Sequence, residues 1–77
     1  MIMNKKYLVS FYLVENDVWK YHFSYTIDYY DLPQTLQSFR ARGYIQKEKN
    51  NLYIKTFYSD VDATYLVYTV IELPIKL

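Results

Sequence analysis

Side-chain alternation in the first third of the chain restricts it to a sheet-based fold more strongly than any other feature. From Trp19 to Ile27, large apolar residues occupy every second position and polar residues occupy the positions between them. A period of two is typical of a strand that buries one face. The preceding run, Tyr7 to Val14, is almost entirely apolar, as in a strand that is largely buried on both faces. We therefore predict two neighbouring strands, Tyr7–Val14 and Val18–Ile27.

The loop between these strands decides which of their side chains share a face. A two-residue loop at Asn16 and Asp17 would place Phe11 opposite His22, an apolar residue against a polar one. A three-residue loop keeps large apolar residues together and gives these partners: Leu13 with Trp19, Phe11 with Tyr21, Val9 with Phe23 and Tyr7 with Tyr25. We predict this second register, with Asn16 or Asp17 in the left-handed conformation that these two residue types tolerate well.

A helix is predicted after Ile27, where the period of the apolar residues changes. Asp31 is a typical N-cap residue, and Pro33 stands in the first turn. An apolar stripe follows at helical spacing: Leu32, Leu36 and Phe39. Gly43, the single glycine of the chain, suits a C-terminal cap because it readily adopts positive φ. We expect a helix of about three turns between Asp31 and Gly43.

The second half of the chain predicts three more strands, separated by a tight turn and a loop. Their ranges are Tyr44–Glu48, Leu52–Tyr58 and Thr64–Leu73. The expected fold is α+β with the order ββαβββ, a single antiparallel five-stranded sheet with one helix on one face. Because the chain has 77 residues, we expect one compact domain over residues 1–77.

Composition indicates a folded protein. Hydrophobic residues make up 52% of the chain and aromatic residues 21%, far more than a disordered chain contains. The net charge of +1 excludes both the acidic excess of a DNA mimic and the basic excess of a non-specific DNA binder. The chain has no cysteine and no uncharged stretch long enough for a membrane helix, so we expect it to be cytoplasmic.

Few residues are suited to catalysis or metal binding. The only histidine, His22, is predicted to lie mid-strand on a polar face with Lys20 and Ser24, and no third group is evident to orient it. The aspartates are scattered over loops without the spacing of a metal site, and one glycine cannot form a glycine-rich phosphate loop. We therefore expect a protein that is not an enzyme and uses no metal or cofactor.

Charge is distributed unevenly along the chain. Residues 40–55 hold five basic residues and one acidic residue, a local charge of +4: Arg40, Arg42, Lys47, Lys49 and Lys55, with Glu48. Two interpretations remain open. Either these basic residues contact an acidic partner, whether RNA, DNA or protein, or the lysines prevent aggregation at the edge of a short hairpin.

Tyrosine is unusually abundant, with 11 in 77 residues. A core this small cannot bury so many hydroxyl groups, and one short helix cannot cover a whole sheet. We therefore expect an exposed sheet face that includes Leu8, Tyr12, Tyr53, Phe57, Leu66 and Tyr68. Exposed tyrosines favour partner binding because their rings are large and have few torsions. The alternative is that they reflect the codon bias of an AT-rich genome and the preference of sheets for tyrosine.

In length, composition and lack of catalytic motifs, the chain resembles the small accessory proteins of phages and mobile elements from AT-rich bacteria, including anti-CRISPR proteins. The resemblance implies an inhibitor of a host defence system. From the residues themselves, we expect a small non-catalytic protein-binding module that occupies a partner's surface. The expected contact residues are Arg40, Arg42, Lys47, Lys49, Tyr53, Tyr58 and Tyr68.

Two other hypotheses remain. In the first, the protein binds nucleic acid, with the basic residues on phosphates and exposed tyrosines stacked on bases. In the second, an exposed sheet face or edge pairs two copies into a homodimer, which is compatible with either kind of partner.

Overall fold

The sheet and the helix expected from the sequence are both present. The computed structural model describes residues 5–47, 54–61 and 64–74. Its elements, in chain order, are β1 (Lys6–Glu15), β2 (Val18–Asp28), a short 3₁₀ helix η1 (Tyr29–Asp31), α1 (Leu32–Ala41), β3 (Ile45–Lys47), β4 (Ile54–Val61) and β5 (Thr64–Leu73). They form one antiparallel five-stranded sheet with one helix, which confirms the predicted α+β class.

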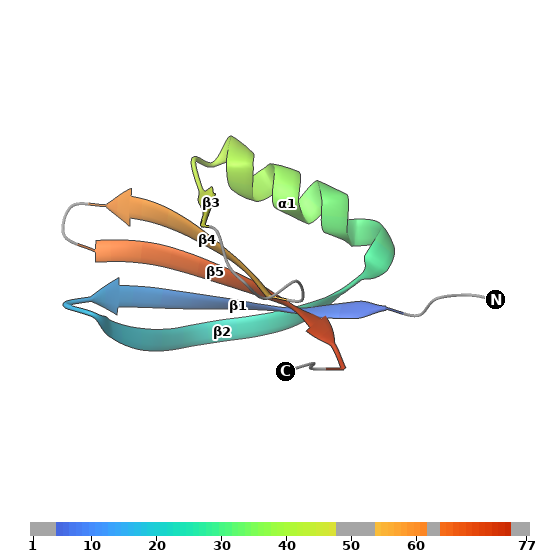
Figure 1. Ribbon diagram of the computed structural model, residues 1–77, viewed down its shortest axis with the longest axis horizontal. Helices are drawn as coiled ribbons and strands as arrows, with labels where there is room; N and C mark the ends of the chain where they lie inside the picture. Colours follow the sequence, from blue (N-terminus) through green and yellow to red (C-terminus); the bar gives the residue numbers. More distant parts are fainter. Residues whose placement is uncertain (1–4, 48–53, 62–63, 75–77) are drawn as a thin grey trace.

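The strands lie in the order β2-β1-β5-β4-β3, so the last strand of the chain returns to the middle of the sheet. Figure 1 shows α1 lying across one face of this sheet, which we call the covered face. The opposite face, which we call the open face, carries no helix within the described residues. β2 is an edge strand, and no described strand pairs with its outer edge.

The core lies between α1 and the covered face. Phe39 of α1 is only 1% exposed, and its ring stacks on that of Tyr68 with 4.4 Å between the ring centroids. Buried residues from the sheet and from the chain after α1 surround this pair: Tyr7, Val9, Tyr44, Phe57 and Val70. Because side chains alternate along a strand, the neighbours of these residues in β1, β4 and β5 point to the open face.

The turn between β1 and β2 has two residues, so the predicted three-residue loop is wrong. Glu15 pairs directly with Val18 across the turn. Both turn residues adopt the left-handed conformation, with φ of 51° at Asn16 and 64° at Asp17. Two consecutive residues with positive φ are what a tight hairpin turn requires, because its twist then matches that of the strands.

A β-bulge follows this turn within β2. Tyr12 pairs with Tyr21, but its neighbour Phe11 pairs with Phe23, so His22 is an extra residue in the ladder. The bulge corrects the mismatch that a two-residue turn creates, because it gives Phe11 an aromatic partner in place of a polar one. As a consequence, Tyr21 shares the open face with Tyr12, whereas Phe23 shares the covered face with Phe11.

The composition of the open face differs in part from the expected one. Leu8 and Tyr12 do lie on it, but Phe57, Leu66 and Tyr68 lie on the covered face. The pairing of β5 explains the difference, because Tyr68 lies between Phe11 and Phe57 on neighbouring strands and shares their face. Tyr53 lies outside the described residues.

Helix α1 begins and ends within the range predicted from the sequence, between Asp31 and Gly43. Asp31 occupies the N-cap position, but its side chain makes no cap hydrogen bond, contrary to expectation. Instead, the Thr35 hydroxyl donates to the carbonyl oxygen of Asp31 at 2.8 Å. After the helix, Gly43 has φ of 90° and the Tyr44 N–H donates to the Phe39 carbonyl at 3.0 Å, as expected of a glycine cap.

Replacement of Asp17 by glycine is expected to stabilise the protein. The left-handed conformation of Asp17 costs energy for any residue with a Cβ atom, and Asn-Gly is the preferred pair for this turn. We expect the Asp17→Gly variant to gain up to about 1 kcal/mol in the free energy of unfolding. Urea denaturation measures this change. Asp17→Ala is the matched control and should lose stability; a gain with alanine would contradict the explanation.

Candidate functional site

Aromatic side chains from four strands meet on the open face. We call them the open-face aromatic cluster: Tyr12 of β1, Trp19 and Tyr21 of β2, Tyr58 of β4 and Tyr65 of β5. The Trp19 ring contacts the Tyr12 ring, with centroids 5.4 Å apart, and also reaches the Tyr58 ring at 6.4 Å. Tyr21 packs on Tyr12 and Tyr65 packs on Tyr58, at 5.8 and 6.3 Å. These rings form a continuous surface from β2 to β4.

The open-face aromatic cluster lies beside a buried residue, and part of the cluster is exposed. Val67 of β5 pairs with Tyr12 on one side and Tyr58 on the other, and it is fully buried on this face. Trp19 spans the two tyrosines, since it contacts both of their rings. Tyr21 is nevertheless 60% exposed and Trp19 46% exposed. The cluster therefore presents large aromatic rings to solvent, and contacts with neighbouring rings beside the buried Val67 hold these rings in place.

β2 exposes large residues on both of its faces. Besides Trp19 and Tyr21 on the open face, Phe23 and Tyr25 are exposed on the covered face. In an edge strand, such residues lie beside backbone groups that can pair with another strand. β2 therefore exposes large side chains on both faces beside an edge that no described strand pairs with, and it also carries two features that limit pairing at an edge, Lys20 and the bulge at His22.

The predicted basic residues do not form one patch. The Arg42 guanidinium lies over three rings of the core on the covered face, those of Phe39, Tyr44 and Tyr68, at 5.4 to 5.6 Å from their centroids. Lys47 belongs to the open face, where its ammonium lies 5.7 Å from the centroid of Tyr58. Arg40 is exposed on α1. Lys49 lies outside the described residues.

The three tyrosines predicted as partner contacts differ in location and exposure. Tyr58 is half-buried and belongs to the open-face aromatic cluster. Tyr68 is only 8% exposed, so the expectation that it is an exposed anchor is wrong. Its position opposite Phe39 makes it a core residue instead. Tyr53 is outside the described residues.

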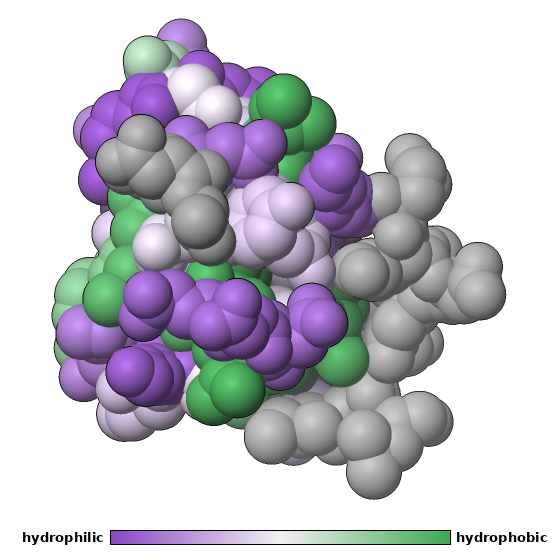
Figure 2. Space-filling model, turned by 90° about the vertical axis from the view of Figure 1, so that its left-hand side faces the viewer, coloured by the Kyte–Doolittle hydropathy of each residue, from purple (hydrophilic) through white to green (hydrophobic). Residues whose placement is uncertain are grey.

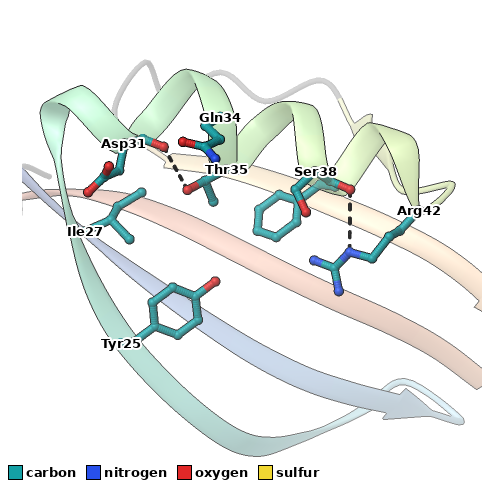
Figure 3. Close-up of a pocket in the computed structure, with 8 residues that line it drawn as sticks. Tyr25, Ile27, Asp31, Gln34, Thr35, Ser38 and Arg42 are labelled. Carbon is teal, nitrogen blue, oxygen red and sulfur yellow. Dashed lines mark hydrogen bonds between the residues drawn. The ribbon is translucent and has the colours of Figure 1, made fainter.

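A groove of about 340 Å³ runs between α1 and β2 on the covered face (Figure 3). Its polar lining comes from Tyr25, Asp31, Gln34, Thr35, Ser38 and Arg42, and its apolar lining from Ile27 and Phe39. Figure 3 shows the Tyr25 hydroxyl pointing toward α1 and the Arg42 side chain extending below the helix. We call this the α1–β2 groove. Asp31 and Arg42 lie toward opposite ends of it, so the groove has an acidic end and a basic end.

Two tyrosines beside Arg42 ionise less readily than an exposed tyrosine. Burial raises the pKa of Tyr25 and of Tyr44, and the neighbouring Tyr68 raises each pKa further. The Arg42 charge acts in the opposite direction and lowers each pKa in part. Both phenols therefore stay protonated and neutral in the pH range where proteins normally work.

These pKa values predict a loss of stability at alkaline pH. Tyrosines of the unfolded chain lose their protons near pH 10. Tyr25 and Tyr44 hold theirs longer in the folded protein, so the unfolded state binds fewer protons and the free energy of unfolding falls as pH rises above about 10. Urea denaturation at a series of pH values should show a smaller fall for Tyr25→Phe and Tyr44→Phe. In the control variant, Tyr30→Phe, the free energy of unfolding should fall with pH as it does in the wild type. If this free energy fell equally in all three variants, Tyr25 and Tyr44 would not be the cause of the fall.

His22 and Ser24 do not share a polar face as expected. The bulge places the His22 ring against Phe11, with centroids 5.7 Å apart. Ser24 pairs with Ser10 on the open face, where the two hydroxyl oxygens are 2.8 Å apart. The structure therefore separates the two groups that a nucleophile and base would require to be adjacent. Among the described residues, no three His, Cys, Asp or Glu side chains are grouped as metal ligands would be.

Sequence reasoning missed the exposed residues of β2. Trp19 and Tyr21 were assigned to the same face as Phe23 and Tyr25, because the alternation continues without a break through His22. One signal could have found the bulge. The Asn-Asp pair favours a two-residue turn, and such a turn can give Phe11 an aromatic partner only if β2 contains one extra residue.

Comparison with known proteins adds no relative. No protein-family model, curated protein or solved structure matches this chain. Among the described residues, no helix has both the length and the apolar character that a membrane-spanning helix requires.

Proposed function

We propose that this protein is a small non-catalytic protein-binding module that acts by occupying a partner's surface. The contact surface in this proposal is the open-face aromatic cluster together with the outer edge of β2. The supporting observation is that Trp19 and Tyr21, on an edge strand, are both exposed and both packed on neighbouring rings. Aromatic residues fixed in this way lose little entropy on binding, which is why they often dominate binding energy.

Hydrophobic residues are also exposed at the end of the sheet where the β1–β2 turn lies. Figure 2 shows them, in green, between hydrophilic residues at this end of the molecule. Val18, next to the turn, is one of the large exposed residues. Interfaces between proteins that also exist separately are about as apolar as other protein surface but are enriched in aromatic residues, so the exposed rings of β2 support the proposal more than this mixed composition does.

The finer proposal is that the partner belongs to a host defence system, that the protein is encoded by a phage or mobile element, and that it acts in the cytoplasm. The support is the resemblance in length and composition to such inhibitors. The experiment is affinity capture from lysates of candidate host bacteria. The wild type and Tyr30→Ala should retain one stoichiometric protein, and a Tyr21→Ala/Tyr65→Ala double variant should lose it. Capture that does not distinguish these variants would contradict the proposed surface.

Nucleic-acid binding is the second candidate function. The observation in its favour is Lys47, whose ammonium lies beside the Tyr58 ring and hence beside the exposed rings of the open-face aromatic cluster. A cation next to aromatic rings is suited to a single strand, whose phosphates and bases both need contacts. Against it, Arg42 lies on the other face of the sheet. A mobility shift with single-stranded oligonucleotides at low salt tests it, and no shift would exclude it.

A homodimer through the outer edge of β2 is a further proposal. An antiparallel pair of identical edge strands satisfies the exposed backbone groups of both copies and is compatible with two-fold symmetry. Light scattering at high micromolar concentration would show twice the monomer mass. A monomer mass at that concentration would exclude this arrangement without affecting the binding of another protein.

A further inference from the structure

Arg42 is held in place by aromatic rings and has no acidic partner among the described residues. Its guanidinium lies over three rings of the core, and its Nε donates a long hydrogen bond of 3.5 Å to the Ser38 carbonyl oxygen. Within the described residues, the ion pairs are Lys5–Glu72, Lys6–Asp28 and Lys20–Glu15, so Arg42 belongs to none of them. Besides Nε–H, a guanidinium has four further N–H groups, and these can donate to an anion.

The other end of the α1–β2 groove has the opposite charge. Asp31 precedes α1, is exposed, and takes part in none of these ion pairs. Its side chain makes no cap hydrogen bond either. The backbone positions of Asp31 and Arg42 are about 16 Å apart along the helix, at about 1.5 Å per residue. Because the Arg42 Nε reaches back to the Ser38 carbonyl oxygen, the two charged groups are nearer than this, within the span of about five residues of extended chain at about 3.3 Å each.

Between its two ends, the groove is lined by side chains that can hydrogen-bond to the peptide groups of a bound chain. Tyr25, Gln34 and Ser38 offer hydroxyl and amide groups that can donate to or accept from peptide groups. Ile27 and Phe39 provide apolar contact in the same groove. A small anion would use only the Arg42 end of such a groove.

We propose that the α1–β2 groove binds an extended segment of a protein partner, with a glutamate or aspartate on Arg42 and a lysine or arginine at Asp31. This site lies on the covered face and uses none of the residues of the open-face aromatic cluster. It goes beyond the proposed function: the groove shares β2 with the proposed contact surface, through Tyr25 and Ile27, but its binding of a peptide can be tested without the proposed partner.

The test is an NMR titration of the ¹⁵N-labelled full chain with a blocked hexapeptide. The peptide has lysine at one end, glutamate at the other, and alternating threonine and valine between them. The amide signals of Tyr25, Thr35 and Ser38 should shift. A peptide with glutamine in place of both charged residues should bind at least about fivefold more weakly, the effect of losing exposed charge pairs.

Three variants locate the charges. Arg42→Gln and Asp31→Asn should each weaken binding of the charged peptide by about threefold or more, and Asp31→Asn does so without altering the contacts between Arg42 and the rings. Arg40→Gln, an exposed arginine that does not line the groove, is the matched control and should bind like the wild type. Equal binding of charged and neutral peptides, or an equal loss with Arg40→Gln, would overturn the proposal.

A simple anion site is the remaining outcome to distinguish. Inorganic phosphate alone should shift the Ser38 signal less than the peptide does and should leave Thr35, nearer Asp31, unchanged. If phosphate reproduces the whole pattern and competes fully with the peptide, the groove binds anions only and the peptide proposal is wrong.

Discussion

Replacement of Phe39 by alanine is expected to remove much of the stability of this domain. Its ring contacts the rings of Tyr44, Phe57 and Tyr68, with centroids 4.4 to 6.0 Å away, and it joins α1 to the sheet. Truncation of a buried phenylalanine costs about 3 to 5 kcal/mol, because apolar contacts are lost and a cavity remains. The free energy of unfolding of a domain of this length is roughly 4 to 12 kcal/mol, so this one substitution should remove between about a quarter and all of it.

Urea denaturation followed by far-ultraviolet circular dichroism measures this loss. Ile45→Ala is a suitable control, since Ile45 is a large apolar residue that is 66% exposed. We expect it to cost less than about 1 kcal/mol, as surface substitutions usually do. If the two variants lost similar amounts, Phe39 would not hold the central place in the core that its burial indicates.

Replacement of Tyr21 by alanine is expected to weaken partner binding by about thirtyfold, or about 2 kcal/mol, while the fold stays intact. Tyr21 is 60% exposed and packs on one ring, that of Tyr12, so its removal leaves the core unchanged. Trp19 is a less clear choice, because it spans Tyr12 and Tyr58 around the buried Val67. Its truncation would mix an effect on binding with an effect on stability.

Isothermal titration calorimetry with the captured partner measures the change in affinity, and the melting temperature is recorded for each variant. Tyr21→Phe keeps the ring and separates its contribution from that of the hydroxyl. Tyr30→Ala removes a tyrosine that is 78% exposed and lies outside the open-face aromatic cluster, so its affinity should equal that of the wild type. A Tyr21→Ala variant that binds as tightly as the wild type would falsify the assignment of this surface.

Prediction from sequence succeeded where the cause is local. The alternation from Trp19 to Ile27 lies within β2, and the spacing of Leu32, Leu36 and Phe39 lies within α1. The capping role of Gly43 is local as well, because positive φ depends on the residue itself. For the same reason, the tolerance of Asn16 and Asp17 for the left-handed conformation was predictable.

Prediction failed where the cause is a contact between distant segments. The bulge at His22 exists because Phe11 gains an aromatic partner, and no residue within β2 marks it. Tyr68 was predicted to be exposed, but it is buried because β5 lies in the middle of the sheet, where α1 covers it. Arg42 was predicted to share a basic patch with Lys47, but the assembled core places the Arg42 guanidinium over three rings on the covered face, whereas Lys47 lies on the open face.

The sequence by itself determined which segments are strands and which is the helix, because periodicity and backbone preference act over a few neighbouring residues. The tertiary structure alone decided which aromatic side chains are core and which reach solvent. A shift of one residue in strand register moves every following side chain to the other face, and only the packing of β1 against β2 and β5 fixes that register.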